Sequence, residues 1–180
     1  MRKLWYYVRR VIRLAYSSER KEKLIWNKLK KLHQEKKWRH GIFENDKYIE
    51  TIFEIAEGVP ATFFYMLYDH AFHCRVKVLE ELPPDLVTDV FVLASHFNNH
   101  LSDGKVVIRV NSGYVEYKIK TELIIPALYE DEILVEIEQH FNTAVDVFAA
   151  FQRLVAEQEA PAIIIADILR KNEEEEPSEE

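Results

Sequence analysis

Apolar residues recur every three to four positions in five stretches of this chain, the spacing that places them on one face of an α-helix. The predicted helices cover residues 1–16, 17–38, 86–101 and 130–156, and a short last helix follows Pro161. The helix over 130–156 has the clearest pattern, which holds for about six turns. Its expected stripe consists of Ile133, Ile137, Phe141, Ala144, Phe148, Phe151 and Val155.

Between the helices the apolar residues alternate, which is the pattern of β-strands with one buried face. Alternation predicts strands near residues 48–55, 72–78, 106–110 and 115–119. Residues 62–68 are apolar at successive positions, which indicates a central strand covered on both faces. Turn signals separate the strands at Glu44-Asn45-Asp46, Gly58-Val59-Pro60, Asp69-His70 and Asn111-Ser112-Gly113.

Two helix starts carry recognisable signals. Ser17-Ser18-Glu19 offers a serine oxygen to the free amides of a first turn and a carboxylate to the positive end of the helix dipole. Pro83-Pro84-Asp85 predicts a helix with proline in its first turn, where the missing N–H costs nothing. The expected buried stripe of that helix consists of Leu86, Val90, Leu93, Ala94, Phe97 and Leu101.

The order of these elements predicts an α+β fold in which an antiparallel sheet of about five strands packs against helices in the order α-β-β-β-α-β-β-α. An extra amphipathic helix precedes it. We expect a basic N-terminal helix over 1–20, an α+β domain over 21–157 and a short C-terminal helix over 158–172. The glutamate-rich residues 173–180 cannot bury apolar area, so we expect a disordered acidic tail there.

The segment from Phe91 to Leu101, followed by Gly104-Lys105-Val106-Val107-Ile108, looks like a helix that ends in an Asn-containing turn and leads into a Gly-Lys strand. With the strands before it and the long helix after it, this order resembles the YbjN-domain family of bacterial proteins over roughly residues 22–156. That family has a fold similar to type III secretion chaperones. The resemblance implies a cytoplasmic protein without known catalytic residues, of a kind named as candidate sensory-transduction regulators. The chaperones form homodimers and hold client segments along apolar grooves.

The charge of the chain is unevenly distributed. Residues 1–40 contain fourteen Lys and Arg against three Glu, a net charge of +11, whereas the remaining residues carry −18. The basic residues 1–40 have three interpretations. They lie on the acidic remainder of the same chain or of a second copy, they bind an anionic surface, or they are solvated. Basic and aromatic residues alternate near Trp26 and Trp38, a pattern found in nucleic-acid binding. The net charge of −18 on residues 41–180 would nevertheless repel a nucleic-acid backbone.

Candidate chemistry is sparse. His96 and His100 are four residues apart and share a helix face, and His70, His73 and Cys74 lie on a nearby predicted strand. A zinc site needs three or four converging groups, and the alternation of His73 with Cys74 places these two on opposite sheet faces. Cys74 follows the apolar register, so we expect a small buried side chain. A metal or enzyme site is the weakest interpretation, because no phosphate loop, nucleophile elbow or metalloprotease helix is present.

We therefore predict a cytoplasmic, non-catalytic module that binds a protein partner or itself as a homodimer, without cofactor, metal or catalytic residues. The alternative is a peripheral protein whose basic first helix lies on a membrane or other anionic surface. Nucleic acid is not expected as a partner. The residues predicted to contact a partner are Leu4, Trp5, Val8, Val11, Ile12, Val90 and Phe97.

Overall fold

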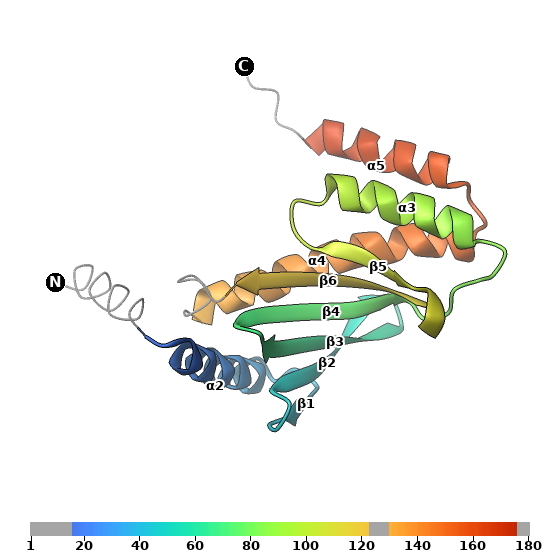
Figure 1. Cartoon of the computed structure of the whole chain (residues 1–180). Coiled ribbons are helices and arrows are strands. Elements are labelled where there is room, and N and C mark those ends of the chain that lie inside the picture. The colour runs from blue at the N-terminus through green and yellow to red at the C-terminus, as the bar shows by residue number, and fades with distance from the viewer. Residues whose placement is uncertain (1–15, 123–129, 176–180) are drawn as a thin grey trace, which may run out of the picture. The chain divides into compact units, whose positions relative to one another are not determined.

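The computed structural model describes residues 16–122 and 130–175, and the helix predicted over 1–16 lies outside these ranges. Figure 1 shows the arrangement of the elements in these ranges. They are, in chain order, α2 (Ser18–Lys36), β1 (His40–Phe43), β2 (Tyr48–Ala56), β3 (Val59–Tyr68), β4 (Ala71–Leu79), α3 (Val87–His100), β5 (Lys105–Arg109), the 3₁₀ turn η1 (Val110–Ser112), β6 (Tyr114–Glu122), α4 (Glu130–Val155) and α5 (Pro161–Glu175).

The strands form one six-stranded antiparallel sheet in the order β1-β2-β3-β4-β6-β5, which confirms the predicted α+β class (Figure 1). The sheet has one strand more than the five expected, because the chain before the Glu44–Lys47 turn pairs as β1 with the start of β2. β6 lies between β4 and β5 in the sheet. In the last hairpin the second strand, β6, is therefore next to β4, and the first strand, β5, forms the edge of the sheet.

Two compact units interleave along the chain. Unit 1 consists of Met1–Val76 and Ile119–Asn142, and unit 2 consists of Lys77–Lys118 and Thr143–Glu180. β4, β6 and α4 each pass from one unit into the other. We describe each unit by itself.

In unit 1, α2 begins and ends where the sequence predicts. The Ser17 hydroxyl accepts a hydrogen bond from the amide of Arg20 at 3.4 Å, which caps the helix. Lys37 ends it in the left-handed conformation, with φ of 54°. The buried face of α2 consists of Ile25, Trp26, Leu29, Leu32 and His33.

α2 and the first half of α4 cover the same face of the sheet in unit 1. His33 of α2 and His140 of α4 both contact the Tyr65 ring, and His140 also contacts Phe63. Thr51 lies opposite Phe63 and shares that face. The core of unit 1 therefore lies between one sheet face and two helices.

The other face of β3 is open, although the sequence predicted a strand covered on both faces. Its side chains alternate between the buried Phe63, Tyr65 and Leu67 and the half-buried Phe64 and Met66. Apolar residues on both faces indicated a doubly covered strand, and that prediction is wrong. Within residues 16–76 and 130–142 of unit 1 the helices pack on one side of this antiparallel sheet, and such a sheet can leave its second face to solvent.

Two turns of unit 1 adopt the left-handed conformation that tight hairpins require. Asp69 and His70 have φ of 50° and 54° and join β3 to β4, as expected for a two-residue hairpin. Gly58 has φ of 70° and lies in the turn between β2 and β3. The predicted break nevertheless extends too far, because Pro60 lies within β3 opposite Glu54. This pairing sits beside a register shift between Glu54 and Ala56, where a missing N–H is tolerated.

In unit 2, α3 packs on β5 and on the second half of α4. Val90, Leu93, Ala94 and Phe97 are buried, as predicted, and the Phe97 ring stacks on Phe151 of α4. The helix starts within one residue of the predicted 86, but the prediction that Pro83-Pro84-Asp85 belong to its first turn is wrong. α3 begins at Val87, because residues 83–86 form a turn closed by a hydrogen bond from the Leu86 amide to the Pro83 carbonyl.

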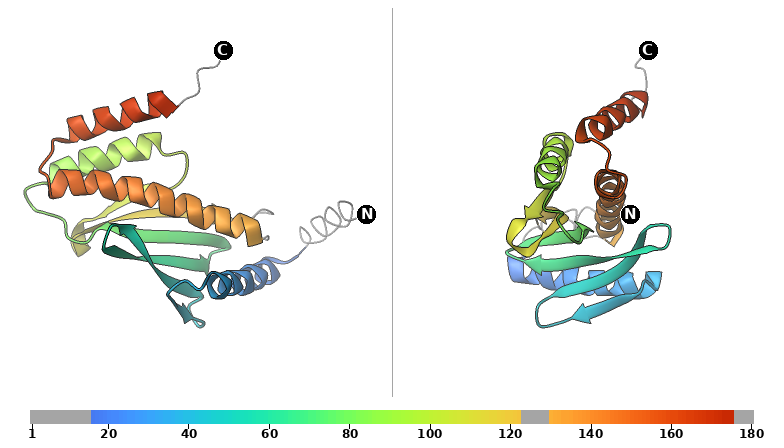
Figure 2. Two further views of the ribbon diagram at one scale, coloured as in Figure 1. Left: turned by 180° about the vertical axis from the view of Figure 1, so that it is seen from behind. Right: turned by 90° about the vertical axis from the view of Figure 1, so that its right-hand side faces the viewer.

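α5 lies beside α3 in unit 2, and an ion pair ties it to α4 (Figure 2). Arg153 of α4 donates to Asp167 of α5 at 2.7 Å and to Glu159 of the preceding loop at 2.6 Å. α5 continues to Glu175, three residues into the segment predicted to be disordered.

Candidate functional site

The sheet face of unit 1 opposite α2 and α4 is open in the described residues. Strand register places on it a row of aromatic, apolar and charged side chains from four neighbouring strands. We call these residues the open face of unit 1: Phe43, Tyr48, Glu50, Phe64, Met66, Tyr68, His73 and Arg75.

Contacts within the open face run from strand to strand. Phe43 stacks on Tyr48, with ring centroids 4.3 Å apart, and Tyr68 stacks on His73 at 3.8 Å. The Arg75 guanidinium lies 5.0 Å from the centroid of the Phe64 ring. Phe43 and Tyr68 are 39% and 53% exposed. Rings held in fixed positions yet open to solvent offer contact area at low entropic cost, as at protein interfaces.

Unit 2 contains an ion pair between β5 and β6. Arg109 donates from Nε and from its terminal nitrogen to Glu116, whose side chain is only 3% exposed. Hydrogen bonding to Glu116 and the charge of this carboxylate raise the pKa of Arg109. The pair holds a fixed cation at the surface of the sheet.

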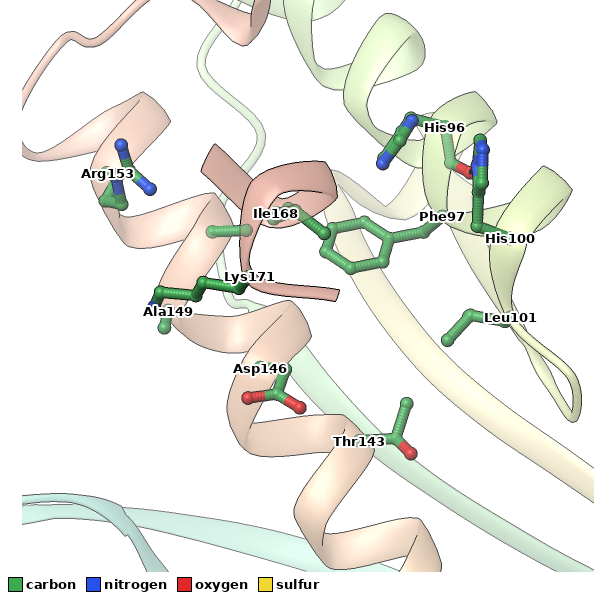
Figure 3. A pocket seen from close by; sticks show the side chains of 11 residues that line it. His96, Phe97, His100, Leu101, Thr143, Asp146, Ala149, Arg153, Ile168 and Lys171 are labelled. Carbon is green, nitrogen blue, oxygen red and sulfur yellow. Dashed lines mark hydrogen bonds between the residues drawn. The ribbon is translucent and has the colours of Figure 1, made fainter. Parts of the chain in front are cut away.

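A cavity of about 350 Å³ lies in unit 2 among α3, α4 and α5 (Figure 3). Figure 3 shows His96 and His100 on one helix and Thr143 and Asp146 on another, with Phe97 between them. This volume is at the lower end of the range for small-molecule sites. The lining residues are His96, Phe97, His100, Leu101, Thr143, Asp146, Ala149, Ala150, Arg153, Ile168 and Lys171.

Three polar side chains of this cavity, His96, His100 and Arg153, make contacts within the protein. His100 donates from Nδ1 to the carbonyl of His96 at 2.8 Å, and the two rings are 4.2 Å apart. Burial, and then the neighbouring His100, lower the pKa of His96, so its ring is neutral near pH 7. Arg153 holds Glu159 and Asp167, which raise its pKa. The volume of the cavity is sufficient for a small molecule.

The other residues singled out for metal chemistry lie elsewhere. Cys74 is buried in the core of unit 1, and burial raises the pKa of its thiol. His70 contacts Glu22 at 3.0 Å, and His73 belongs to the open face. Among residues 16–122 and 130–175, no group of three His, Cys, Asp or Glu could hold a metal ion. None of the helices in these ranges is long and apolar enough to cross a membrane.

Two of the predicted partner contacts are in the core. Val90 and Phe97 are 0% and 6% exposed, whereas their neighbours Phe91 and Val92 are 48% and 47% exposed. A partner of α3 would therefore meet Phe91 and Val92 first. The other five predicted contacts, Leu4, Trp5, Val8, Val11 and Ile12, lie outside the described residues and stay predictions.

The open face was not predicted from the sequence, although one signal of it was present. Phe64, Met66 and Tyr68 are the large side chains that made β3 look covered on both sides. An apolar second face on a strand is equally typical of a surface kept for a partner. Phe43 could not have been found, because its place on this face depends on pairing with Tyr48.

The described elements define an α+β fold with one six-stranded antiparallel sheet. The structure is similar to the crystal structure of YbjN from E. coli, a candidate transcription regulator, with a TM-score of 0.55 and 10% sequence identity. The match covers 74% of this chain and 92% of the YbjN chain, and at this identity it shows a shared fold. No protein-family model and no curated protein matches the sequence.

Proposed function

We propose that this protein is a non-catalytic binding module that engages a protein partner through the open face of unit 1. One observation carries the proposal: stacked rings of Phe43, Tyr48 and Tyr68 lie on a sheet face that the described helices of this unit leave open. Exposed aromatic residues on a rigid sheet are typical of interaction surfaces.

The fold and the charge support the same function. The similar structure of YbjN belongs to a candidate transcription regulator, and a regulator acts through binding. A partner protein fits better than nucleic acid, because residues 41–180 carry a net charge of −18. Self-association through this face would make the protein a homodimer, and we count a second copy among its protein partners.

Site-specific photo-crosslinking in the native host tests the proposal. A photoreactive phenylalanine replaces Tyr68 on the open face or, as a control, the exposed Lys23 of α2. We expect a discrete protein adduct from position 68, with another protein or with a second copy, and none from position 23. Equal adducts at both positions, or none at position 68, would refute a partner on this face.

A double substitution then separates binding from folding. Phe43→Ser with Tyr68→Ser removes exposed aromatic area and no core side chain. We expect the adduct from a crosslinker at Phe64 to disappear, while the thermal unfolding midpoint changes by only a few degrees. An adduct of unchanged yield would contradict the proposal.

A further inference from the structure

Two opposite charges lie on either side of β3 in the open face of unit 1. Glu50 of β2 is directly opposite Phe64 of β3, and Phe64 is directly opposite Arg75 of β4. The three residues therefore form one row across the strands, with Phe64 in the middle. The strands that carry the two charges are roughly 10 Å apart, at about 4.8 Å per strand. The Arg75 guanidinium lies 5.0 Å from the centroid of the Phe64 ring, a contact that holds the cation within the row.

The two charges of this row have no counter-charge in the part of the chain that the structure describes. Over residues 16–122 and 130–175, neither Glu50 nor Arg75 makes an ion pair or a side-chain hydrogen bond. Both side chains are half-buried, and Nε of Arg75 is buried without a hydrogen-bond partner. A charged group withdrawn from water without a partner costs free energy. A carboxylate beside Arg75 and a cation beside Glu50 would recover that cost.

The side chains of β3 between these charges are uncharged. On this face they are Thr62, Phe64, Met66 and Tyr68. In a symmetric dimer, residues on the two-fold axis meet the same residue of the second copy, so a charge there would repel itself. An axis along β3, with the two sheets face to face, meets no such charge. The same rotation exchanges β2 with β4, so that Glu50 of each copy meets Arg75 of the other.

Sheet twist does not disturb this match. Two sheets that pack face to face lie about 10 Å apart and usually cross at about 30°. Glu50 and Arg75 are each one strand, or about 5 Å, from the axis, so a rotation of about 30° shifts them by only about 2.5 Å. Glutamate and arginine side chains are long enough to cover this shift and to meet between the sheets.

We propose that a second copy of this chain occupies the open face of unit 1, related to the first by a two-fold axis that runs along β3. Phe64 and Met66 of the two copies pack together at the centre, and Glu50 and Arg75 form two equivalent ion pairs on either side. A second copy is favoured over an unrelated protein because one rotation makes the face complementary to itself in charge. This inference rests on the proposed function and names the partner.

Sedimentation velocity of the full chain tests the inference. We expect a dimer. Glu50→Arg or Arg75→Glu places two like-charged pairs in the interface, so the dissociation constant should rise about a hundredfold. Glu50→Gln removes the ion pairs with little change of shape and should raise it about tenfold. The control Lys23→Glu changes the charge equally on α2, on the other side of the sheet, and should leave the dimer intact. Circular dichroism and the thermal unfolding midpoint check that each variant folds.

Mixing the two reversal variants gives a readout that a purely structural role would not produce. The Glu50→Arg chain carries two cations in the row, and the Arg75→Glu chain carries two anions. A one-to-one mixture should therefore form a heterodimer, although each variant alone is weakened. The double variant with both substitutions should form a homodimer again.

A monomeric unsubstituted chain, a dimer that none of the row variants weakens, or a mixture that does not form the heterodimer would overturn the inference. A crosslinked adduct from Tyr68 with a different protein, together with a monomeric chain, would refute only the second copy as the partner. Absence of both the dimer and any adduct would refute the proposed function as well.

Discussion

His33 predicts how the stability of unit 1 depends on pH. The ring is fully buried between α2 and β2, where Nδ1 donates to the Leu29 carbonyl at 2.7 Å and Nε2 accepts from the Thr51 hydroxyl at 2.8 Å. Both nitrogens are thus satisfied in the neutral ring. Burial lowers the pKa of His33 from 6.5 to about 4.

The sign and size of the effect follow from these two pKa values. The unfolded chain takes up a proton near pH 6.5 and the folded chain only near pH 4, so stability is complete above pH 6.5 and falls as the pH is lowered. A tenfold difference in proton affinity between the folded and unfolded chains is worth about 1.4 kcal/mol, so the full loss is about 3 kcal/mol. About 2 kcal/mol of it is lost by pH 5.

Urea unfolding at several pH values, followed by tryptophan fluorescence, measures this loss. The double variant His33→Leu with Thr51→Val replaces both partners by apolar groups of similar size, so its stability at pH 8 should lie within about 1 kcal/mol of the unsubstituted chain. Because other groups titrate equally in both proteins, the difference between them isolates His33. We expect the variant to gain about 2 kcal/mol relative to the unsubstituted chain between pH 8 and pH 5. Parallel stability curves would refute the reasoning.

Three further predictions concern single side chains. The Asn98 side chain forms two hydrogen bonds with the backbone of Val106, at 2.7 and 3.0 Å. Asn98→Ala should therefore lower the free energy of unfolding in urea by about 2 kcal/mol. A decrease no greater than that caused by Asn99→Ala would contradict this prediction. The buried Cys74 thiol should react with Ellman's reagent about a hundredfold more slowly in the native chain than in urea, and equal rates would be evidence against its burial. Arg153→Met should speed amide exchange in α5 at a cost of about 1 kcal/mol, because its carboxylate partners are partly exposed; unchanged exchange would show that the ion pairs do not hold α5.

The predicted membrane contact has its own measurement. Deletion of residues 1–18 should abolish co-sedimentation with liposomes of anionic lipid if the basic first helix binds them. Equal, negligible binding of the intact and deleted chains would remove this alternative.

Local patterns in the sequence were enough to predict most helices and strands. The serine cap at Ser17 and the Asp69-His70 hairpin depend on residues a few positions apart, so a short stretch of sequence contains their whole signal. The stripe of α4 was predicted only in part: Phe141, Phe148 and Val155 are half-buried, whereas Val147, Ala150 and Leu154 are buried. The α+β class follows from the order of these elements. Local patterns gave wrong predictions at two places. The residues before α3 form a turn, and Pro60 pairs with Glu54 of the neighbouring strand.

Only the tertiary structure decided which faces are covered and which side chains meet. Alternation assigns Glu50 and Arg75 each to one face of its own strand, but their position on either side of Phe64 depends on the register of β2 and β4 with β3. Burial of His33 likewise depends on Thr51, which is eighteen residues away and on another element. Periodicity assigns residues to a common side of their own element, whereas coverage of that side is a property of long-range packing.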